Sequence, residues 1–232
     1  MESITQAGGH ALVLLFSADP ELWNIIGVSF RVSLAAIVVT APLALVLAFA
    51  LAYARFPGQR PVVTVVHSLQ AIPAVVVGLA VYLMLTRNGP LGDLRLLFTQ
   101  TAITIGQIVL GFPLLLALGH SALQAADRRA WETARTLGAP PWRAMLTVMR
   151  DVRFALLAAV IAAFARIIAE VGASIMLGGN IQYHTRNIPT AIALETSKGE
   201  YAQGIALGIV LLTLALALNF CLSLLHGKGA MR

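Results

Sequence analysis

The sequence predicts an all-α integral membrane protein. Of its 232 residues, 59% are apolar and only 11% are charged, whereas soluble domains typically carry about 25% charged residues. Five apolar runs are long enough to cross a hydrocarbon core, which takes about 20 helical residues. An isolated strand would leave its backbone groups unpaired in lipid, so all five runs are predicted to be helices.

The predicted transmembrane helices follow the apolar runs in chain order. They cover about residues 22–54, 62–86, 101–125, 154–177 and 201–225. The first run is longer than a bilayer requires, so we expect it to begin outside the membrane near Trp23 or to cross at a steep tilt. Ahead of it, Ile4 to Phe16 is too short to span and predicts an N-terminal interfacial helix. The whole chain, 1–232, is predicted to be a single transmembrane domain with no signal peptide.

Three prolines lie inside the predicted spans, at Pro42, Pro73 and Pro113. Each lacks a backbone donor and can bend its helix. A bent bundle could enclose a polar path, but prolines are common in membrane helices and do not decide this point.

The lysines and arginines predict the orientation of the chain, because positive loops tend to stay in the cytoplasm. One set of loops carries ten of them: Arg55, Arg60, Arg128, Arg129, Arg135, Arg143, Arg150, Arg153, Lys228 and Arg232. The other set carries only Arg87, Arg95, Arg186 and Lys198. The sequence therefore predicts an inner-membrane protein with its N-terminus outside and its C-terminus in the cytoplasm. Topology and anionic lipid account for the basic pI, so we expect no nucleic-acid partner.

The long inner loop, residues 126–153, predicts a helical hairpin. Asp127 to Leu137 favours a helix, Gly138 can end it in a left-handed turn, and Pro140-Pro141 begins a second short helix. The turn leaves a small apolar surface formed by Leu137, Ala139, Pro140 and Trp142. Arg135 and Arg143 flank this surface. Such a surface suits a protein-binding anchor, and composition alone leaves open an amphipathic hairpin lying on the membrane.

The hairpin also resembles a known family. Glu132-Thr133-Ala134, three residues and then Gly138 are similar to the E-A-A-x3-G signature in permease subunits of ABC-type importers, with Thr133 where alanine is usual. In that family the loop forms a coupling helix that sits in a groove on a cytoplasmic ATPase. The resemblance implies ATPase-coupling roles for Glu132, Thr133, Ala134, Arg135, Leu137, Gly138, Ala139 and Trp142. After Val148 the sequence Met149-Arg150-Asp151 departs from the family's usual Leu-Pro.

Further segments resemble the permeases for molybdate, tungstate and sulfate: Asp19 to Trp23, Ala54 to Gly58, and Ala165 to Ala173. Ala191 to Gly199 is most similar to the tungstate branch. The resemblance implies the type I permease fold and ATP-driven import of a tetrahedral oxyanion, with tungstate expected, by alternating access. Molybdate, sulfate or another anion are alternatives. A gradient-driven secondary transporter or channel is the alternative of another class, and the hairpin counts against it.

The resemblance also implies the partners of the chain. These are a second copy of itself, two ABC ATPase subunits, the lipid bilayer, and an extracytoplasmic oxyanion-binding protein that docks on the outer loops 87–100 and 178–200. The sequence has no G-x-x-x-x-G-K-[ST] phosphate loop, so ATP hydrolysis is expected from another polypeptide. We predict no catalytic residue, no metal ligand and no cofactor in this chain. His67 and His120 are expected to be hydrogen-bonded packing residues.

Arg166 and Glu170 are ionisable residues inside an otherwise apolar predicted span. At positions i and i+4 they share a helix face, and a lipid-facing position would be costly, so we expect them to point into the bundle or toward water. They form either a structural ion pair or part of an anion path in which Glu170 holds Arg166. Ser174, four residues on, is expected on the same face. A G-x-x-x-G pattern, Gly204 to Gly208, predicts a helix contact within the chain or between copies.

Overall fold

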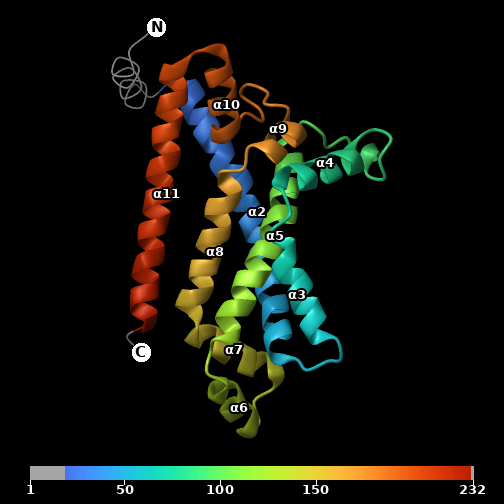
Figure 1. The fold of residues 1–232 in the computed structure, drawn as a ribbon, viewed down its shortest axis with the longest axis vertical. Coiled ribbons are helices and arrows are strands. Elements are labelled where there is room, and N and C mark those ends of the chain that lie inside the picture. Colours follow the sequence, from blue (N-terminus) through green and yellow to red (C-terminus); the bar gives the residue numbers. More distant parts are fainter. Residues whose placement is uncertain (1–18, 231–232) are drawn as a thin grey trace. The chain divides into compact units, whose positions relative to one another are not determined.

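The computed structural model describes residues 19–230, with side chains as far as Ser223. The predicted interfacial helix at Ile4 to Phe16 lies outside the described residues. Within them the chain forms helices and no strand, which confirms the all-α fold class. Figure 1 shows these elements: α2 Pro20–Tyr53, α3 Gln59–Leu69, α4 Ala74–Leu85, the 3-10 turn η1 Gly92–Leu94, α5 Gln100–Gln124, α6 Arg128–Thr136, α7 Pro141–Asp151, α8 Arg153–Ile168, α9 Gly172–Gly178, α10 Ile188–Lys198 and α11 Tyr201–Ala230.

Three helices, α2, α5 and α11, are long and apolar enough to cross a membrane. Two further candidates arise if each of the bent pairs α3–α4 and α8–α9 counts as one span, which gives up to five. The predicted spans 22–54, 101–125 and 201–225 coincide with the three long helices within a few residues. Pro42 and Pro113 lie inside continuous helices.

The other two predicted spans are wrong as single helices. The run 62–86 breaks between Leu69 and Ala74, and Pro73 is the N-cap of α4. Proline cannot donate to a helix that runs through it, and it disfavours helical geometry at the residue before it. The run 154–177 breaks after Ile168, and α9 is bent by 62° from α8. There the Glu170 carboxylate accepts the Gly172 N–H at 3.1 Å, so a side chain replaces the helical backbone acceptor.

The described residues form two compact units. The first contains the chain up to Ala36, Pro73–Leu110 and Phe164–Ala217. One of its cores packs α10 against the start of α2 and the first half of α11, with Leu22, Ile25, Ile188 and Leu207 fully buried. A capping box of Asn187 and Thr190 begins α10. The predicted outer loop 178–200 therefore contains a helix that is buried on one face, which the mixture of polar and apolar residues did not reveal.

A close helix contact joins α4 to α9 in the same unit (Figure 1). Gly78 of α4 faces Ala173 of α9 so closely that a Cβ placed on the glycine would lie 2.8 Å from the Ala173 Cα. Of the G-x-x-x-G pair on α11, Gly204 faces α10, whereas a Cβ added to Gly208 would meet no atom within 4 Å. The pattern thus marks a contact within the chain at one of its two glycines.

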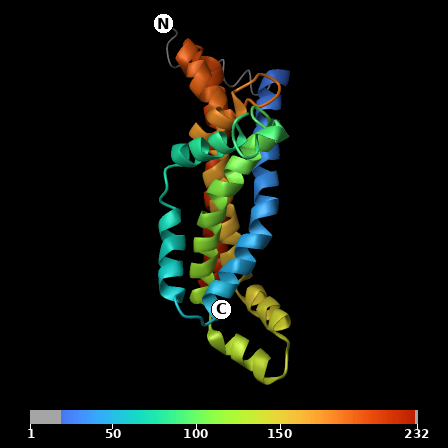
Figure 2. The ribbon, with the colours of Figure 1, turned by 90° about the vertical axis from the view of Figure 1, so that its right-hand side faces the viewer.

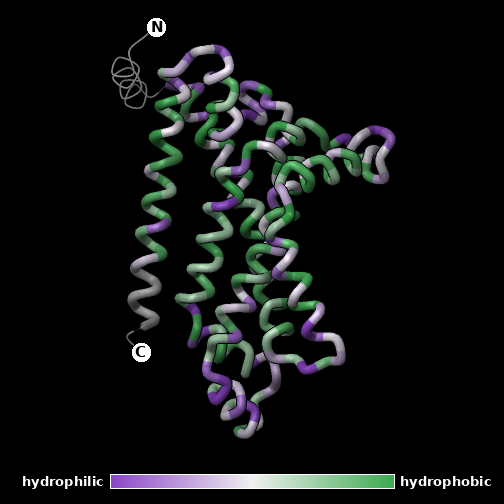
Figure 3. Tube along the Cα trace, in the orientation of Figure 1, coloured by the Kyte–Doolittle hydropathy of each residue, from purple (hydrophilic) through white to green (hydrophobic). Residues whose placement is uncertain are grey.

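The second unit contains Ile37–Ile72, Gly111–Ala163 and the chain from Leu218. It holds α3 and a hairpin of α6 and α7, whose two short helices pack on each other (Figure 2). Figure 3, coloured by hydropathy, shows that α6 of this hairpin is polar, whereas the described part of α11 is mostly apolar. The helical hairpin predicted within residues 126–153 is therefore confirmed.

Candidate functional site: the α6–α7 hairpin and the Arg166–Glu170 pair

The hairpin begins with a capped helix. The Asp127 side chain accepts the Arg129 N–H at 2.9 Å and so satisfies one of the free donors at the start of α6. A carboxylate at this position also stabilises the positive end of the helix dipole. Local chemistry therefore fixes the residue at which the hairpin starts.

A glycine turn joins the two helices. Gly138 has a φ of 83°, the left-handed conformation that the sequence predicts. The Gly138 N–H donates to the Arg135 carbonyl at 3.1 Å and the Ala139 N–H to the Ala134 carbonyl at 3.0 Å. These two bonds form a Schellman motif, which satisfies the last carbonyls of α6. Pro140 then caps α7 and Pro141 is its first residue, where a missing N–H costs nothing.

The turn carries an exposed apolar surface. The Leu137 side chain is 82% exposed and Trp142 is 55% exposed, although both are large and apolar. Arg143 lies over the Trp142 ring, with 5.0 Å between its guanidinium carbon and the ring centroid. Arg135 donates to the Ala139 carbonyl at 2.9 Å, which closes the turn from the other side. Glu132 and Thr133 are exposed, and Ala134 and Ala139 are half-buried. The predicted coupling residues are thus neighbours on one short hairpin.

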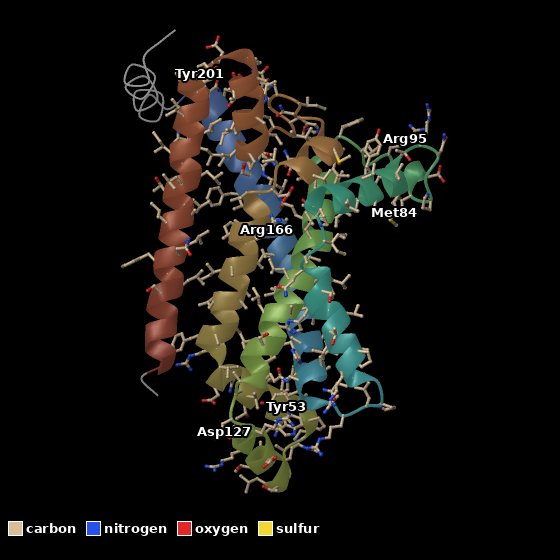
Figure 4. The ribbon with its side chains drawn as sticks, viewed as in Figure 1. Tyr53, Met84, Arg95, Asp127, Arg166 and Tyr201 are labelled. Atoms are coloured by element: carbon tan, nitrogen blue, oxygen red, sulfur yellow. The ribbon has the colours of Figure 1, made fainter. Side chains whose placement is uncertain are left out.

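An aromatic cluster fastens α6 to the end of α2, and sequence reasoning missed it. Phe49 and Tyr53 stack with ring centroids 4.6 Å apart, and Trp131 of α6 lies 5.3 Å and 5.4 Å from the two rings. Arg128 adds a hydrogen bond to the Ala52 carbonyl at 3.2 Å and lies over the Tyr53 ring. In Figure 4, Tyr53 and Asp127 lie together at this junction. The spacing of Phe49 and Tyr53, one helical turn apart, was the available signal.

The predicted pair in the fourth apolar run is present. Arg166 Nη1 lies 2.9 Å from Glu170 Oε2, with the Arg166 side chain 57% exposed and the Glu170 side chain 9% exposed. Arg166 is labelled in Figure 4. Arg166 belongs to the last turn of α8 and Glu170 follows the end of that helix, so the ion pair lies at the C-terminus of α8. Ser174 is not on the same helix face as predicted, because it belongs to α9 beyond the bend. Its hydroxyl is buried and makes no hydrogen bond among the described residues.

Sequence reasoning also missed Arg31, an arginine within the first apolar run. Its Nη1 donates to Gln100 Oε1 at 3.4 Å, and the Gln100 amide donates to the His184 carbonyl at 2.7 Å.

His67 and His120 face each other with 3.3 Å between Nε2 and Nδ1, so they form a hydrogen-bonded pair as expected of packing histidines. Among the described residues there is no cluster of three or more metal-ligating side chains.

Comparison with known proteins gives a family match over residues 19–228, to the binding-protein-dependent transport system inner membrane component. The chain is 39% identical to the tungstate uptake system permease protein TupB of Peptoclostridium acidaminophilum, over 94% of this chain and 96% of that protein. It is 30% identical to the molybdenum transport system permease protein ModB of Escherichia coli K12, over 86% and 90%. Among solved structures, an amino acid ABC transporter crystallised with histidines matches 93% of this chain and 97% of its own with a TM-score of 0.65 and 16% identity.

Proposed function

We propose, since the chain belongs to the family of binding-protein-dependent transport system inner membrane components, that it is the permease subunit of an ATP-driven ABC importer for tetrahedral oxyanions. It is a multi-pass inner membrane protein of that family. Tungstate is the proposed cargo, which is supported by the higher identity to a tungstate permease, 39%, than to a molybdenum permease, 30%. The single family match over 19–228 supports one permease domain.

The observation that carries this proposal is the α6–α7 hairpin. Its exposed Leu137 and Trp142 form a compact apolar surface flanked by arginines, which are the features that recur at the centre of protein interfaces. We infer that this surface fits a groove on a cytoplasmic ATPase subunit that supplies ATP hydrolysis. Glu132, Thr133 and Arg135 lie exposed on α6 and are proposed to line the edge of the same contact.

The proposed mechanism is alternating access by two copies of the chain with two ATPases. ATP binding closes the ATPases and moves the two hairpins together, which opens the path to the outside and receives the anion from a binding protein. Hydrolysis separates the ATPases and returns the path to the inward state. The aromatic cluster of Phe49, Tyr53 and Trp131 is proposed to transmit the motion of α6 to α2.

We propose Arg166 as a cation beside the anion path. Its side chain is more than half exposed in the single chain, and an arginine in an apolar run is costly unless it faces water or protein. One carboxylate oxygen of Glu170 accepts a hydrogen bond from the Arg166 guanidinium, and the other accepts from the Gly172 N–H at the start of α9. The Ser174 hydroxyl is a further candidate donor to an oxyanion. Since a transported ion must also leave, weak contacts at several points suit this role better than a deep arginine cage.

Purification from native membranes tests the assignment. We expect an ABC ATPase to copurify with the wild-type chain and to be lost on Gly138→Val, because a β-branched residue is strained at a φ of 83°. Gly199→Val is the matched control: Gly199 also has a φ of 83° and no atom near its Cβ position, but it ends α10 outside the hairpin. Copurification that survives both substitutions contradicts the hairpin as the ATPase contact. A complex without any ATPase contradicts the importer assignment and favours a gradient-driven transporter.

Competition tests the cargo. Uptake of labelled tungstate into cells that depend on this permease should be inhibited by unlabelled tungstate at lower concentrations than by molybdate, and by molybdate more than by sulfate. An order in which molybdate or sulfate competes best would leave the ABC permease assignment intact and replace the cargo.

A further inference from the structure

The basic residues of the proposed outer loops divide into two classes. Arg186 pairs with Glu21 at 2.9 Å, and Lys198 pairs with Glu195 at 3.0 Å. Arg87 and Arg95 are exposed and form no ion pair within the described part of the chain. Two of the four outer cations therefore form ion pairs inside the fold, and the other two form none among the described residues.

The two unpaired arginines line one cavity. Its volume is about 310 Å³, and its walls are Leu85, Arg87, Gly92, Arg95 and Leu97. Leu85 is buried and Leu97 is half-buried, so apolar and basic residues line the same open pocket. In Figure 4, Arg95 lies on the loop at the far end of α4.

Tight backbone bonds hold the loop that forms this cavity. The Leu91 N–H donates to the Met84 carbonyl and the Gly92 N–H to the Gly89 carbonyl, both at 3.0 Å. Any Cβ on Gly89 or Gly92 would collide with backbone carbonyls at the end of α4. Arg95 itself has a φ of 49°, an uncommon conformation for a side chain of this size. These backbone contacts place Arg87 and Arg95 beside the same pocket in the chain without a partner.

We infer that this cavity, formed by Arg87 and Arg95, is a docking site for a carboxylate side chain on the extracytoplasmic oxyanion-binding protein. A guanidinium binds a carboxylate through two parallel hydrogen bonds, and the leucines in the lining suit the methylene stem of a Glu or Asp better than a hydrated inorganic dianion. Asp93, exposed on the same loop, forms no ion pair with either arginine. The inference rests on the proposed function and on the proposed orientation of the loops.

The test uses the permease with its ATPase in proteoliposomes of neutral phosphatidylcholine, stimulated by purified binding protein loaded with tungstate. The double variant Arg87→Gln/Arg95→Gln should raise the binding-protein concentration for half-maximal ATPase stimulation at least ten-fold while leaving the maximal rate unchanged. Added salt should weaken stimulation of the wild type more than of the variant, because salt screens the two arginine charges that only the wild type carries. Arg60→Gln, which removes an exposed cation from a loop on the proposed cytoplasmic side, should leave the half-maximal concentration unchanged.

Each other outcome overturns the inference in a distinguishable way. An unchanged half-maximal concentration in the double variant overturns the docking site and leaves the proposed function standing. Competition by free tungstate in the wild type but not in the variant makes the cavity an oxyanion site, and a defect that appears only in anionic lipid makes it a headgroup site. If the wild type shows no stimulation by the binding protein, the proposed function fails together with the inference.

Discussion

At the scale of single residues, side chains at helix ends contribute most to the candidate sites. Glu170 accepts from Arg166 with one carboxylate oxygen and from the Gly172 N–H with the other. It therefore neutralises a charge in an apolar run and also ends α8 where α9 begins. Trp131 likewise connects two elements, because it belongs to α6 of the hairpin and packs against two aromatic rings of α2.

Substitution of Glu170 should separate its two contacts. Glu170→Gln keeps an acceptor for the Gly172 N–H and loses only the ion pair, which we expect to lower the free energy of unfolding by about 1 kcal/mol, since Arg166 is half exposed. Glu170→Ala also leaves the N–H unpaired and should cost about 1 kcal/mol more. Thermal unfolding in detergent measures both. Equal losses for Gln and Ala would show that the bond to Gly172 contributes nothing.

Substitution of Trp131 tests whether the aromatic cluster transmits motion. Trp131→Ala removes contacts worth about 0.5–1.5 kcal/mol per ring pair, so we expect α6 to loosen from α2 and the tungstate imported per ATP hydrolysed to fall several-fold. Trp131→Phe keeps a ring in place and should retain most of the coupling. The ratio of uptake to hydrolysis is the readout, because a variant that merely folds poorly lowers both together. An unchanged ratio in Trp131→Ala would remove the cluster from the mechanism.

At the scale of elements, the α4–α9 contact depends on the absence of a side chain at Gly78. A Cβ there would meet the Ala173 Cα at 2.8 Å and its Cβ at 3.0 Å. Gly78→Ala is therefore expected to destabilise the protein by about 1–3 kcal/mol through overpacking. Gly27→Ala is the control, because Gly27 lies inside α2 with no atom within 4 Å of a Cβ position. That substitution should be neutral or stabilising by up to about 1 kcal/mol. Thermal unfolding that ranks the two variants equally would contradict this packing.

The elements also show what the sequence could predict. The long apolar runs predicted α2, α5 and α11, and Gly138 with Pro140-Pro141 predicted the hairpin, because local preferences decide such features. The break at Pro73 was not predicted, since apolar composition is the same on both sides of it and prolines at Pro42 and Pro113 are accommodated within helices. Ser174 was misplaced because apolar composition also continues across the break after Ile168, where Glu170 accepts the Gly172 N–H. The aromatic cluster and the cavity of Arg87 and Arg95 join residues through tertiary contacts that no local spacing encodes.

At the scale of the whole molecule, the distribution of arginines and lysines sets the proposed orientation. Ten basic residues lie in the loops that include the hairpin, and four lie in the others. The hairpin can reach a cytoplasmic ATPase, and the Arg87–Arg95 cavity an extracytoplasmic protein, only if the two regions lie on opposite sides of the membrane. Both proposals therefore depend on one topology.

Accessibility to a membrane-impermeant maleimide tests that topology in intact cells. Cys221, the single cysteine of the chain, is first replaced by serine, and a cysteine is then placed at Ser197 or at Thr147. Both positions are exposed hydroxyl residues that bond back to a carbonyl of their own helix, so the substitutions are matched. Ser197→Cys should react from outside, and Thr147→Cys should react only after the membrane is permeabilised. The reverse pattern would place the hairpin outside, where no ATPase can bind it, and would refute the coupling role even if the fold is correct.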